Sequence, residues 1–206
     1  MNSLRAYIKE CILLEGRYDQ VVNDLSRDIV SLFGKDYYTE MEDFFVEGAT
    51  VELIIDYAVD NAVKGFDFVL AYSDNELIEI EISYNPSDFP AMMNEFIYEL
   101  KEVLRHEIEH VTQYLYPSKQ HLVPPKNRRD LASWEYFTAP EEIPAHVRGF
   151  YKRSKTSKIP LDIIIDTFLD ERRGMFDDES KIAFVKDEWL KYAKKFLPAA
   201  IYSYEE

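Results

Sequence analysis

The chain has 206 residues, and 47 % of them are hydrophobic, which is enough for a sizeable core in a single domain. Its formal net charge of −15 disfavours binding to nucleic acid or to an acidic membrane surface, because both would repel the molecule on average. A single cysteine, Cys11, excludes an internal disulfide and favours a reducing compartment. The sequence contains neither a signal-peptide pattern nor the run of about 18 apolar residues that a membrane helix needs. We therefore expect a cytoplasmic globular protein.

The first fifty residues show helical periodicity. Amphipathic patterns predict helices over about residues 3–15 and 18–33, with Gly34 ending the second. Residues 1–50 are therefore interpreted as a helical N-terminal layer of the domain.

The pattern changes to that of a sheet over residues 51–90. Residues 51–59 (VELIIDYAV) are rich in β-formers, and residues 66–84 alternate apolar and polar side chains about the turn signal Ser73-Asp74-Asn75. This alternation predicts a hairpin with one buried face. The residues of that face are Phe66, Phe68, Leu70, Tyr72, Ile78, Ile80, Ile82 and Tyr84.

Helices dominate the rest of the chain. A long helix is predicted from about residue 91 to 116, stopped by Pro117, and a Pro-containing connection follows over 117–138. A shorter helix is expected over 140–152, with Pro140 in its first turn. We assign residues 91–156 to helices that form the site described next. Residues 157–206 are assigned to two C-terminal helices, over about 160–173 and 179–196.

The long predicted helix contains the pentapeptide HEIEH, in which His106, Glu107 and His110 match the pattern H-E-x-x-H. Two histidines four residues apart on a helix lie side by side, so both can bind one ion at about 2.0–2.1 Å. A glutamate directly after the first histidine can point at water on the same ion. The spacing therefore predicts a catalytic zinc site.

The position of the motif on its helix strengthens this prediction. At 100° per residue, Glu107 projects from the middle of an apolar stripe, where a carboxylate is costly unless it is paired or bound. The stripe consists of Phe96, Leu100, Val103, Leu104, Val111 and Tyr114, whereas Lys101, Glu102, Arg105 and Glu109 are expected on the wet face. The alternative is that Glu107 pairs with a buried arginine and that both histidines are ordinary core residues.

A catalytic zinc needs a third protein ligand and an open fourth position. The metzincin extension requires Gly and His where this chain has Gln113 and Tyr116, so that class is excluded. From the residues alone, four downstream side chains remain candidates for the third ligand. They are His121, Glu141, Glu142 and His146.

HEIEH after a β-hairpin, followed by YFTAPEEIPAH over residues 136–146, resembles the small gluzincins. These are zincin-fold zinc metallopeptidases whose third ligand is a glutamate on a later helix. The shared pattern Y-x-x-x-P-x-E-x-x-A is met by Tyr136, Pro140, Glu142 and Ala145. The resemblance implies an α+β, zincin-like fold with a small antiparallel or mixed sheet packed on the active-site helix. It selects Glu142 over Glu141 as the third ligand.

The resemblance also implies a mechanism and a substrate class. One Zn²⁺ per chain would polarise a peptide carbonyl and activate water, with Glu107 as general base, on a protein or peptide substrate. Candidates for stabilising the oxyanion are Tyr136, His121, Arg148 and Tyr151. In such folds extended substrate adds to the edge of a strand, and residues 76–84 are the candidate strand.

Two other functions remain open from the sequence. A zincin-fold binding or structural module, such as a virion component, could retain the metal site without catalysis. A DNA-associated metalloprotease resembling the Spartan-like group is the other, because residues 119–158 contain nine Lys/Arg against four acids. Those enzymes use a third histidine rather than a glutamate, and a solvated loop and helix face would explain the same charges.

The opening MNSLRAYIKECILLEG resembles the openings of proteins of large tailed phages. This resemblance implies that the protein acts in the cytoplasm of an infected bacterium or within a virion. A small protease in either place could process an assembly protein or a host protein.

Overall fold

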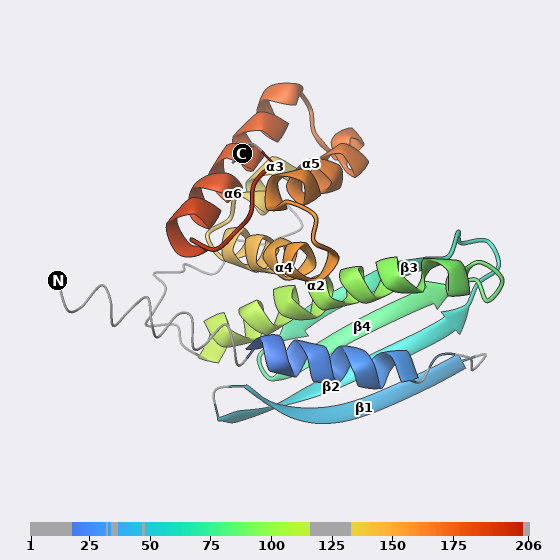
Figure 1. Cartoon of the computed structure of the whole chain (residues 1–206). Coiled ribbons are helices and arrows are strands. Elements are labelled where there is room, and N and C mark those ends of the chain that lie inside the picture. The colour runs from blue at the N-terminus through green and yellow to red at the C-terminus, as the bar shows by residue number, and fades with distance from the viewer. Residues whose placement is uncertain (1–17, 32, 34–36, 47, 116–132, 204–206) are drawn as a thin grey trace. The chain divides into compact units, whose positions relative to one another are not determined.

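The computed structural model describes residues 18–31, 33, 37–46, 48–115 and 133–203, and these have an α+β architecture (Figure 1). The chain divides into two compact units, Met1–Thr112 and Gln113–Glu206. The first unit contains the sheet. The described elements of the second unit are all helices, and they include the last three residues of α2. The interpretation of residues 1–206 as one zincin-like domain stays a prediction.

The sheet of the first unit has four strands, β1 (Tyr37–Val46), β2 (Ala49–Val59), β3 (Phe66–Asp74) and β4 (Leu77–Tyr84), in the order β1-β2-β4-β3. β2 and β4 run parallel, and the other two pairs are antiparallel. The prediction of a small mixed sheet is confirmed. However, β4 is an interior strand, so residues 76–84 cannot offer the edge predicted for substrate, and the edge strands of the sheet are β1 and β3.

The helical layer predicted for residues 1–50 is wrong from residue 37 onward, because β1 begins there. Alternating burial shows why this stretch is a strand: Phe44 is 8 % exposed, Phe45 70 % and Val46 1 %. Such alternation of aromatic and β-branched residues suits a sheet with one covered face. Residues 18–31 are helical, as predicted, and the helix predicted over 3–15 lies outside the described residues.

The predicted hairpin is present, with Asn75 in a left-handed conformation (φ 56°) at its turn. Its predicted buried face is correct on β4, where every second residue from Ile78 to Tyr84 is buried. On β3 it fails after Phe68, because the register passes from Phe68 opposite Ile82 to Leu70 opposite Glu81. Val69 is thus an extra residue, a β-bulge, and the alternation is inverted beyond it.

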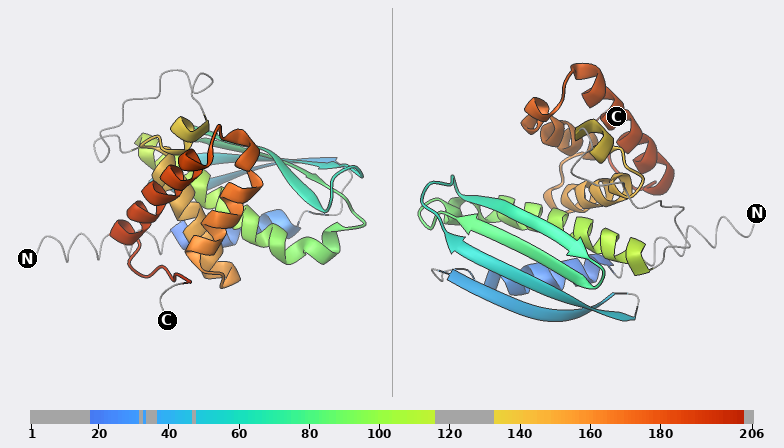
Figure 2. Two further views of the ribbon diagram at one scale, coloured as in Figure 1. Left: turned by 90° about the horizontal axis from the view of Figure 1, so that it is seen from above. Right: turned by 180° about the vertical axis from the view of Figure 1, so that it is seen from behind.

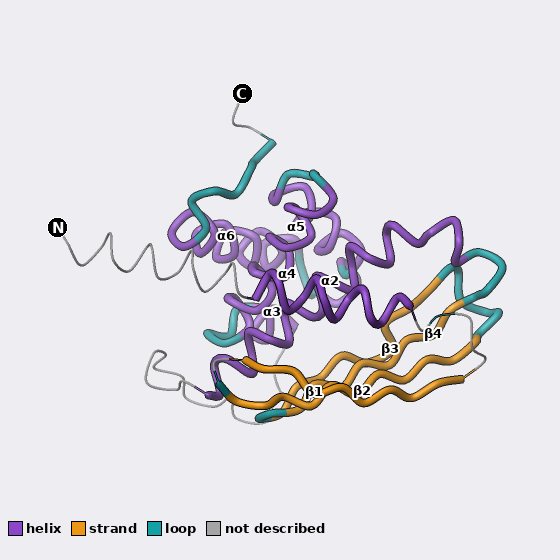
Figure 3. The backbone as a smooth tube through the Cα atoms, turned by 60° about the horizontal axis from the view of Figure 1, so that its bottom comes forward, coloured by secondary structure: helices purple, strands orange, loops and turns teal. Residues whose placement is uncertain are grey.

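Helix α2 (Phe89–Leu115) lies on one face of the sheet, together with the helix of residues 18–31 (Figures 1, 2 and 3). An aromatic cluster fixes its first half there, with ring centroids 4.6–5.9 Å apart for most pairs among Phe33, Phe66, Phe68, Phe89 and Phe96. Each such pair contributes about 0.5–1.5 kcal/mol beyond the area that it buries.

The predicted apolar stripe of α2 is largely correct. Phe96, Leu100, Leu104 and Val111 are buried, as is Ile108, which the prediction left out, whereas Tyr114 is 56 % exposed. The predicted wet face is wrong at two positions.

Arg105 and Glu109 are 3 % and 6 % exposed. They form a buried ion pair with a nitrogen–oxygen distance of 2.9 Å, and the Arg105 guanidinium lies over the ring of Tyr18. The helix of residues 18–31 covers this side of α2, which is why two charges that should be solvated are not.

The second unit contains α3 (Ser133–Phe137), α4 (Glu142–Ser157), α5 (Leu161–Glu171), the short 3-10 helix η3 (Arg173–Met175) and α6 (Glu179–Phe196). The three predicted helices of this part of the chain are thus present: α6 has the predicted ends, whereas the ends of α4 and α5 are shifted. α4 begins after Pro140 rather than at it, and α3 lies inside the predicted connection, whose residues 116–132 are outside the described part.

Trp189 of α6 is the centre of the second unit's core. It is fully buried, and its indole N–H donates to the carbonyl of Phe137 at 2.8 Å. The buried face of α6 is formed by Val185, Trp189 and Ala193, whereas Phe184 is 46 % exposed. No helix in the described part of the chain is long and apolar enough to cross a lipid bilayer.

We predict that Glu109→Ala lowers the free energy of unfolding by about 3–5 kcal/mol, because it leaves the buried Arg105 charge without its partner. The matched control is Asp24→Ala, which removes the acid of the exposed Asp24–Arg27 pair and should cost at most about 1 kcal/mol. Urea unfolding measures both values. Equal losses in the two variants would contradict the prediction.

Candidate metal centre

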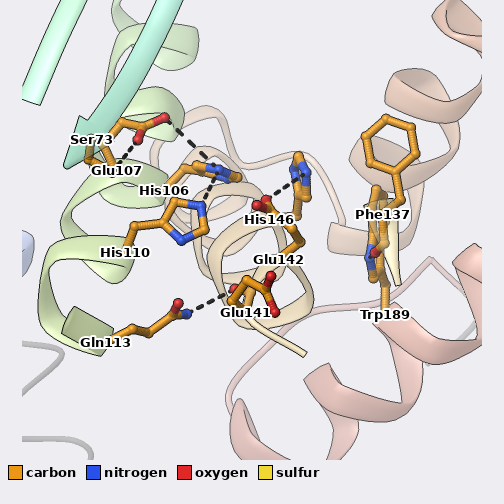
Figure 4. A network of polar contacts seen from close by, with 10 residues as sticks. All are labelled: Ser73, His106, Glu107, His110, Gln113, Phe137, Glu141, Glu142, His146 and Trp189. Carbon is orange, nitrogen blue, oxygen red and sulfur yellow. Dashed lines mark hydrogen bonds and ion pairs between the residues drawn. The ribbon is translucent and has the colours of Figure 1, made fainter. Parts of the chain in front are cut away.

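The two histidines of HEIEH lie side by side on α2 (Figure 4). The Nε2 atoms of His106 and His110 are 3.0 Å apart, and their ring centroids are 4.7 Å apart. A tetrahedral ion with metal–nitrogen bonds of about 2.0–2.1 Å holds two ligand nitrogens about 3.3 Å apart. A small rotation of the side chains would therefore bring both nitrogens onto one ion.

Glu107 lies between this pair and the sheet. Its side chain is buried, with 5 % of the residue exposed, and its Oε2 accepts a 2.8 Å hydrogen bond from the hydroxyl of Ser73 on β3. Its Oε1 is 4.0 Å from Nε2 of His106. The buried arginine of the alternative reading is Arg105, which pairs with Glu109 instead.

Glu141 and Glu142 stand at the start of α4 in the second unit and are 6 % and 1 % exposed. Glu142 lies in the first helical turn, as predicted, where the helix dipole favours a carboxylate. Its Oε2 is 3.8 Å from Nε2 of His146, one turn further along α4. A buried carboxylate with an imidazole beside it is chemically suited to bind a cation.

His146, on α4 of the second unit, is packed among aromatic rings. Its centroid is 5.1 Å from the ring of Trp189, 5.4 Å from Phe137 and 5.8 Å from Phe150, onto which it stacks. Its Nε2 faces Glu142. This setting places the imidazole of His146 beside the carboxylate of Glu142, and the choice between these two as third ligand stays a prediction.

The predicted oxyanion stabilisers divide into three groups. Arg148 donates from Nε to the hydroxyl of Tyr192 at 3.3 Å, and the ring of Tyr151 lies under Lys155. Tyr136, on α3, has its ring 6.3 Å from that of His146. His121 lies outside the described residues.

The basic segment of residues 119–158 is described from residue 133 onward. Lys152, one of its charges, is 4 % exposed, so it belongs to the interior and not to a surface that could bind DNA. The remaining described positive charges, apart from Arg148, lie toward the end of α4.

The last turn of α2 belongs to the second unit. Gln113, 7 % exposed, donates from its side-chain amide to the backbone carbonyl of Glu141 at 2.9 Å. This contact joins the helix that carries HEIEH to the residue directly before Glu142 (Figure 4). In the sequence, Gln113 is informative only as a departure from the metzincin pattern, and nothing around it predicts a hydrogen bond to the carbonyl of Glu141.

Ser73 is the second residue that the sequence analysis missed. The turn signal Ser73-Asp74-Asn75 assigned it to the hairpin loop, but it is the second-last residue of β3. A serine in a turn is ordinary, so the local sequence contains no signal for its bond to a residue 34 positions away.

Comparison with known proteins gives no match: no family model, no curated protein and no solved structure is significantly similar to the chain.

We predict that Gln113→Ala lowers the free energy of unfolding by about 1–3 kcal/mol, because it leaves the carbonyl of Glu141 without this buried donor. Gln20→Ala is the control, since the amide of Gln20 donates to Asp24 at an exposed site. Its cost should stay within about 0.5 kcal/mol. Denaturant titration followed by tryptophan fluorescence would detect the difference, and an unchanged midpoint for Gln113→Ala would refute it.

Proposed function

We propose that the protein is a zinc-dependent metallopeptidase of gluzincin type. The observation that carries the proposal is the group on α2: two histidine nitrogens 3.0 Å apart, directly beside a buried glutamate. Two imidazoles in register suit zinc, and a carboxylate next to them is the base that peptide hydrolysis needs. A zincin-like fold is part of this proposal.

We further propose that Glu142 is the third ligand. His106, His110 and Glu142 together offer two imidazole nitrogens and a carboxylate oxygen, a donor set used by catalytic zinc sites. The support is the Gln113 contact: Gln113 lies three residues after His110, on the same side of α2, and holds the carbonyl directly before Glu142. His146 beside Glu142 would orient the ligand carboxylate, as hydrogen-bonding neighbours of metal ligands do.

When bound, zinc would lower the pKa of a water molecule and polarise the carbonyl of the scissile peptide bond. The protein's own contribution is to take up and deliver the proton. Glu107 would accept the proton of the attacking water and pass it to the amine that leaves. Its burial suits this role, because a carboxylate shielded from bulk water interacts more strongly with nearby charges.

A binding module with a retained metal site has no use for this base. Glu107 is buried at a free-energy cost, and it would be replaceable by an apolar residue of similar size if only the metal mattered. Its presence beside the histidine pair therefore favours catalysis over a structural role.

Metal content is the first test. Purified protein should contain about one zinc per chain, and His106→Ala or His110→Ala should abolish binding because two of three ligands are too few for tight retention. Glu142→Ala also leaves two of the three proposed ligands and should abolish tight retention, whereas His146→Ala should keep the metal with reduced affinity. Elemental analysis and chelator competition measure these outcomes. Folded wild-type protein prepared with excess zinc yet free of metal would overturn the proposal.

Catalysis is the second test. Glu107→Gln keeps the size and burial of the side chain but removes the base, so hydrolysis of a peptide library should fall by a factor on the order of 10² to 10⁴. The variant should retain its zinc. Mass spectrometry of the products measures the change. Wild-type protein that binds zinc but cleaves nothing in the library would favour the binding module instead.

A further inference from the structure

We infer that Ser73 is a positioning residue for the general base. Its hydroxyl holds one oxygen of Glu107, so that the other oxygen is the one presented to the metal centre. This inference rests on the proposed function for its catalytic consequence, whereas the contact itself belongs to the first unit and can be tested without metal.

Because of the β-bulge at Val69, the side chains of Phe66, Phe68 and Ser73 all point to the same face of the sheet. Phe66 and Phe68 contact Phe96 of α2 and therefore face that helix. In a regular strand, Ser73 would point the opposite way, because it is an odd number of residues from Phe68. The extra residue inverts the alternation, and Ser73 pairs with Ile78, which is fully buried on the face that α2 covers.

Exposure along β3 agrees with this inversion at Leu70, Tyr72 and the partly buried Ser73, whereas Ala71, opposite Ile80 on the covered face, is exposed as well. Leu70 and Tyr72, which the uninterrupted alternation would bury beside Phe68, are 38 % and 41 % exposed. Leaving two large apolar side chains in solvent has a free-energy cost. Redirecting a side chain beside a functional site is a known use of such bulges, and the side chain redirected here is Ser73.

The contact distinguishes the two oxygens of Glu107. Ser73 Oγ donates to Oε2 at 2.8 Å, a bond to a charged acceptor and therefore stronger than a neutral one. Oε1 lies on the other side, 4.0 Å from Nε2 of His106 (Figure 4). The Ser73 bond thus assigns Oε1 the task of accepting the proton.

The last torsion of a glutamate is broad, so the carboxylate plane of an unanchored Glu107 could rotate widely. A base that must meet a proton at hydrogen-bond distance loses rate when its orientation is not fixed. One hydroxyl bond on Oε2 restricts this rotation before substrate arrives. Ser73 therefore affects turnover and not the affinity for substrate or metal.

The kinetic test uses Ser73→Ala, Ser73→Thr and the matched control Ser83→Ala. Ser83 lies on neighbouring β4 but on the opposite face, since its neighbours Ile82 and Tyr84 are buried. Ser73→Ala should lower kcat roughly tenfold with KM and zinc content unchanged. Ser73→Thr keeps the hydroxyl and should recover most of kcat, and Ser83→Ala should behave as wild type. Unchanged kcat in Ser73→Ala overturns the inference, as does an equal loss in Ser83→Ala.

A double-mutant cycle in metal-free protein tests the contact without activity. Ser73→Ala, Glu107→Ala and the double variant are compared by urea unfolding. A coupled pair means that Ser73→Ala lowers the folding equilibrium constant roughly tenfold in wild type and only slightly in the Glu107→Ala background. Equal effects in both backgrounds overturn the inference. If the wild type hydrolyses no peptide although the cycle shows coupling, the proposed function has failed and the Ser73–Glu107 contact stands.

Discussion

The burial of one carboxyl group, that of Glu107, is the constraint on which this part of the first unit depends. A charged group taken out of water costs several kcal/mol unless hydrogen bonds or a cation compensate it. At 5 % exposure Glu107 needs such compensation, and Ser73 supplies part of it from another element. The bulge in β3 brings Ser73 onto the face that Glu107 occupies, and it leaves Leu70 and Tyr72 partly exposed on the other face.

The two halves of α2 bury different kinds of side chain. Its first half is held by aromatic residues such as Phe89 and Phe96, and it carries no comparable buried charge in the described structure. Its second half buries Arg105, Glu107 and Glu109, with the ion pair on one side and the candidate base on another. The apolar half anchors the helix on the sheet, and the polar half carries its buried charges.

Local patterns in the sequence predicted much of the fold because they depend only on neighbouring residues. Periodicity found α2, the buried face of β4 and the extent of α6 over residues 179–196. It failed where a distant partner decides the outcome. The periodicity of α2 predicts a solvated Arg105, but the helix of residues 18–31 covers it. The turn signal predicts Ser73 in a loop, but Ser73 lies in β3, where the bulge reverses the direction of its side chain.

The prediction of the site followed the same division. The spacing of His106 and His110 defines half of it, because a helix places these residues together without help. The other half requires a residue from beyond the helix. A metzincin obtains its third ligand from the residues directly after the motif, where a glycine turns the chain. Here α2 continues in helical form through Gln113 to Leu115, so the residues directly after the motif stay within the helix and no glycine turns the chain there.

Gln113 occupies the position of that glycine, but it lies within α2 and contacts the segment before the proposed third ligand. From Glu107 to Gln113 the helix rises about 9 Å, a length fixed by its backbone hydrogen bonds. At the far end the Gln113 amide holds the carbonyl of Glu141, and the next residue is the proposed third ligand. In the proposed site the third ligand comes from α4, and Gln113 at the end of α2 contacts the residue directly before it. Gln113, which excludes the metzincin class, would thus help to hold the third ligand of the proposed gluzincin-type site.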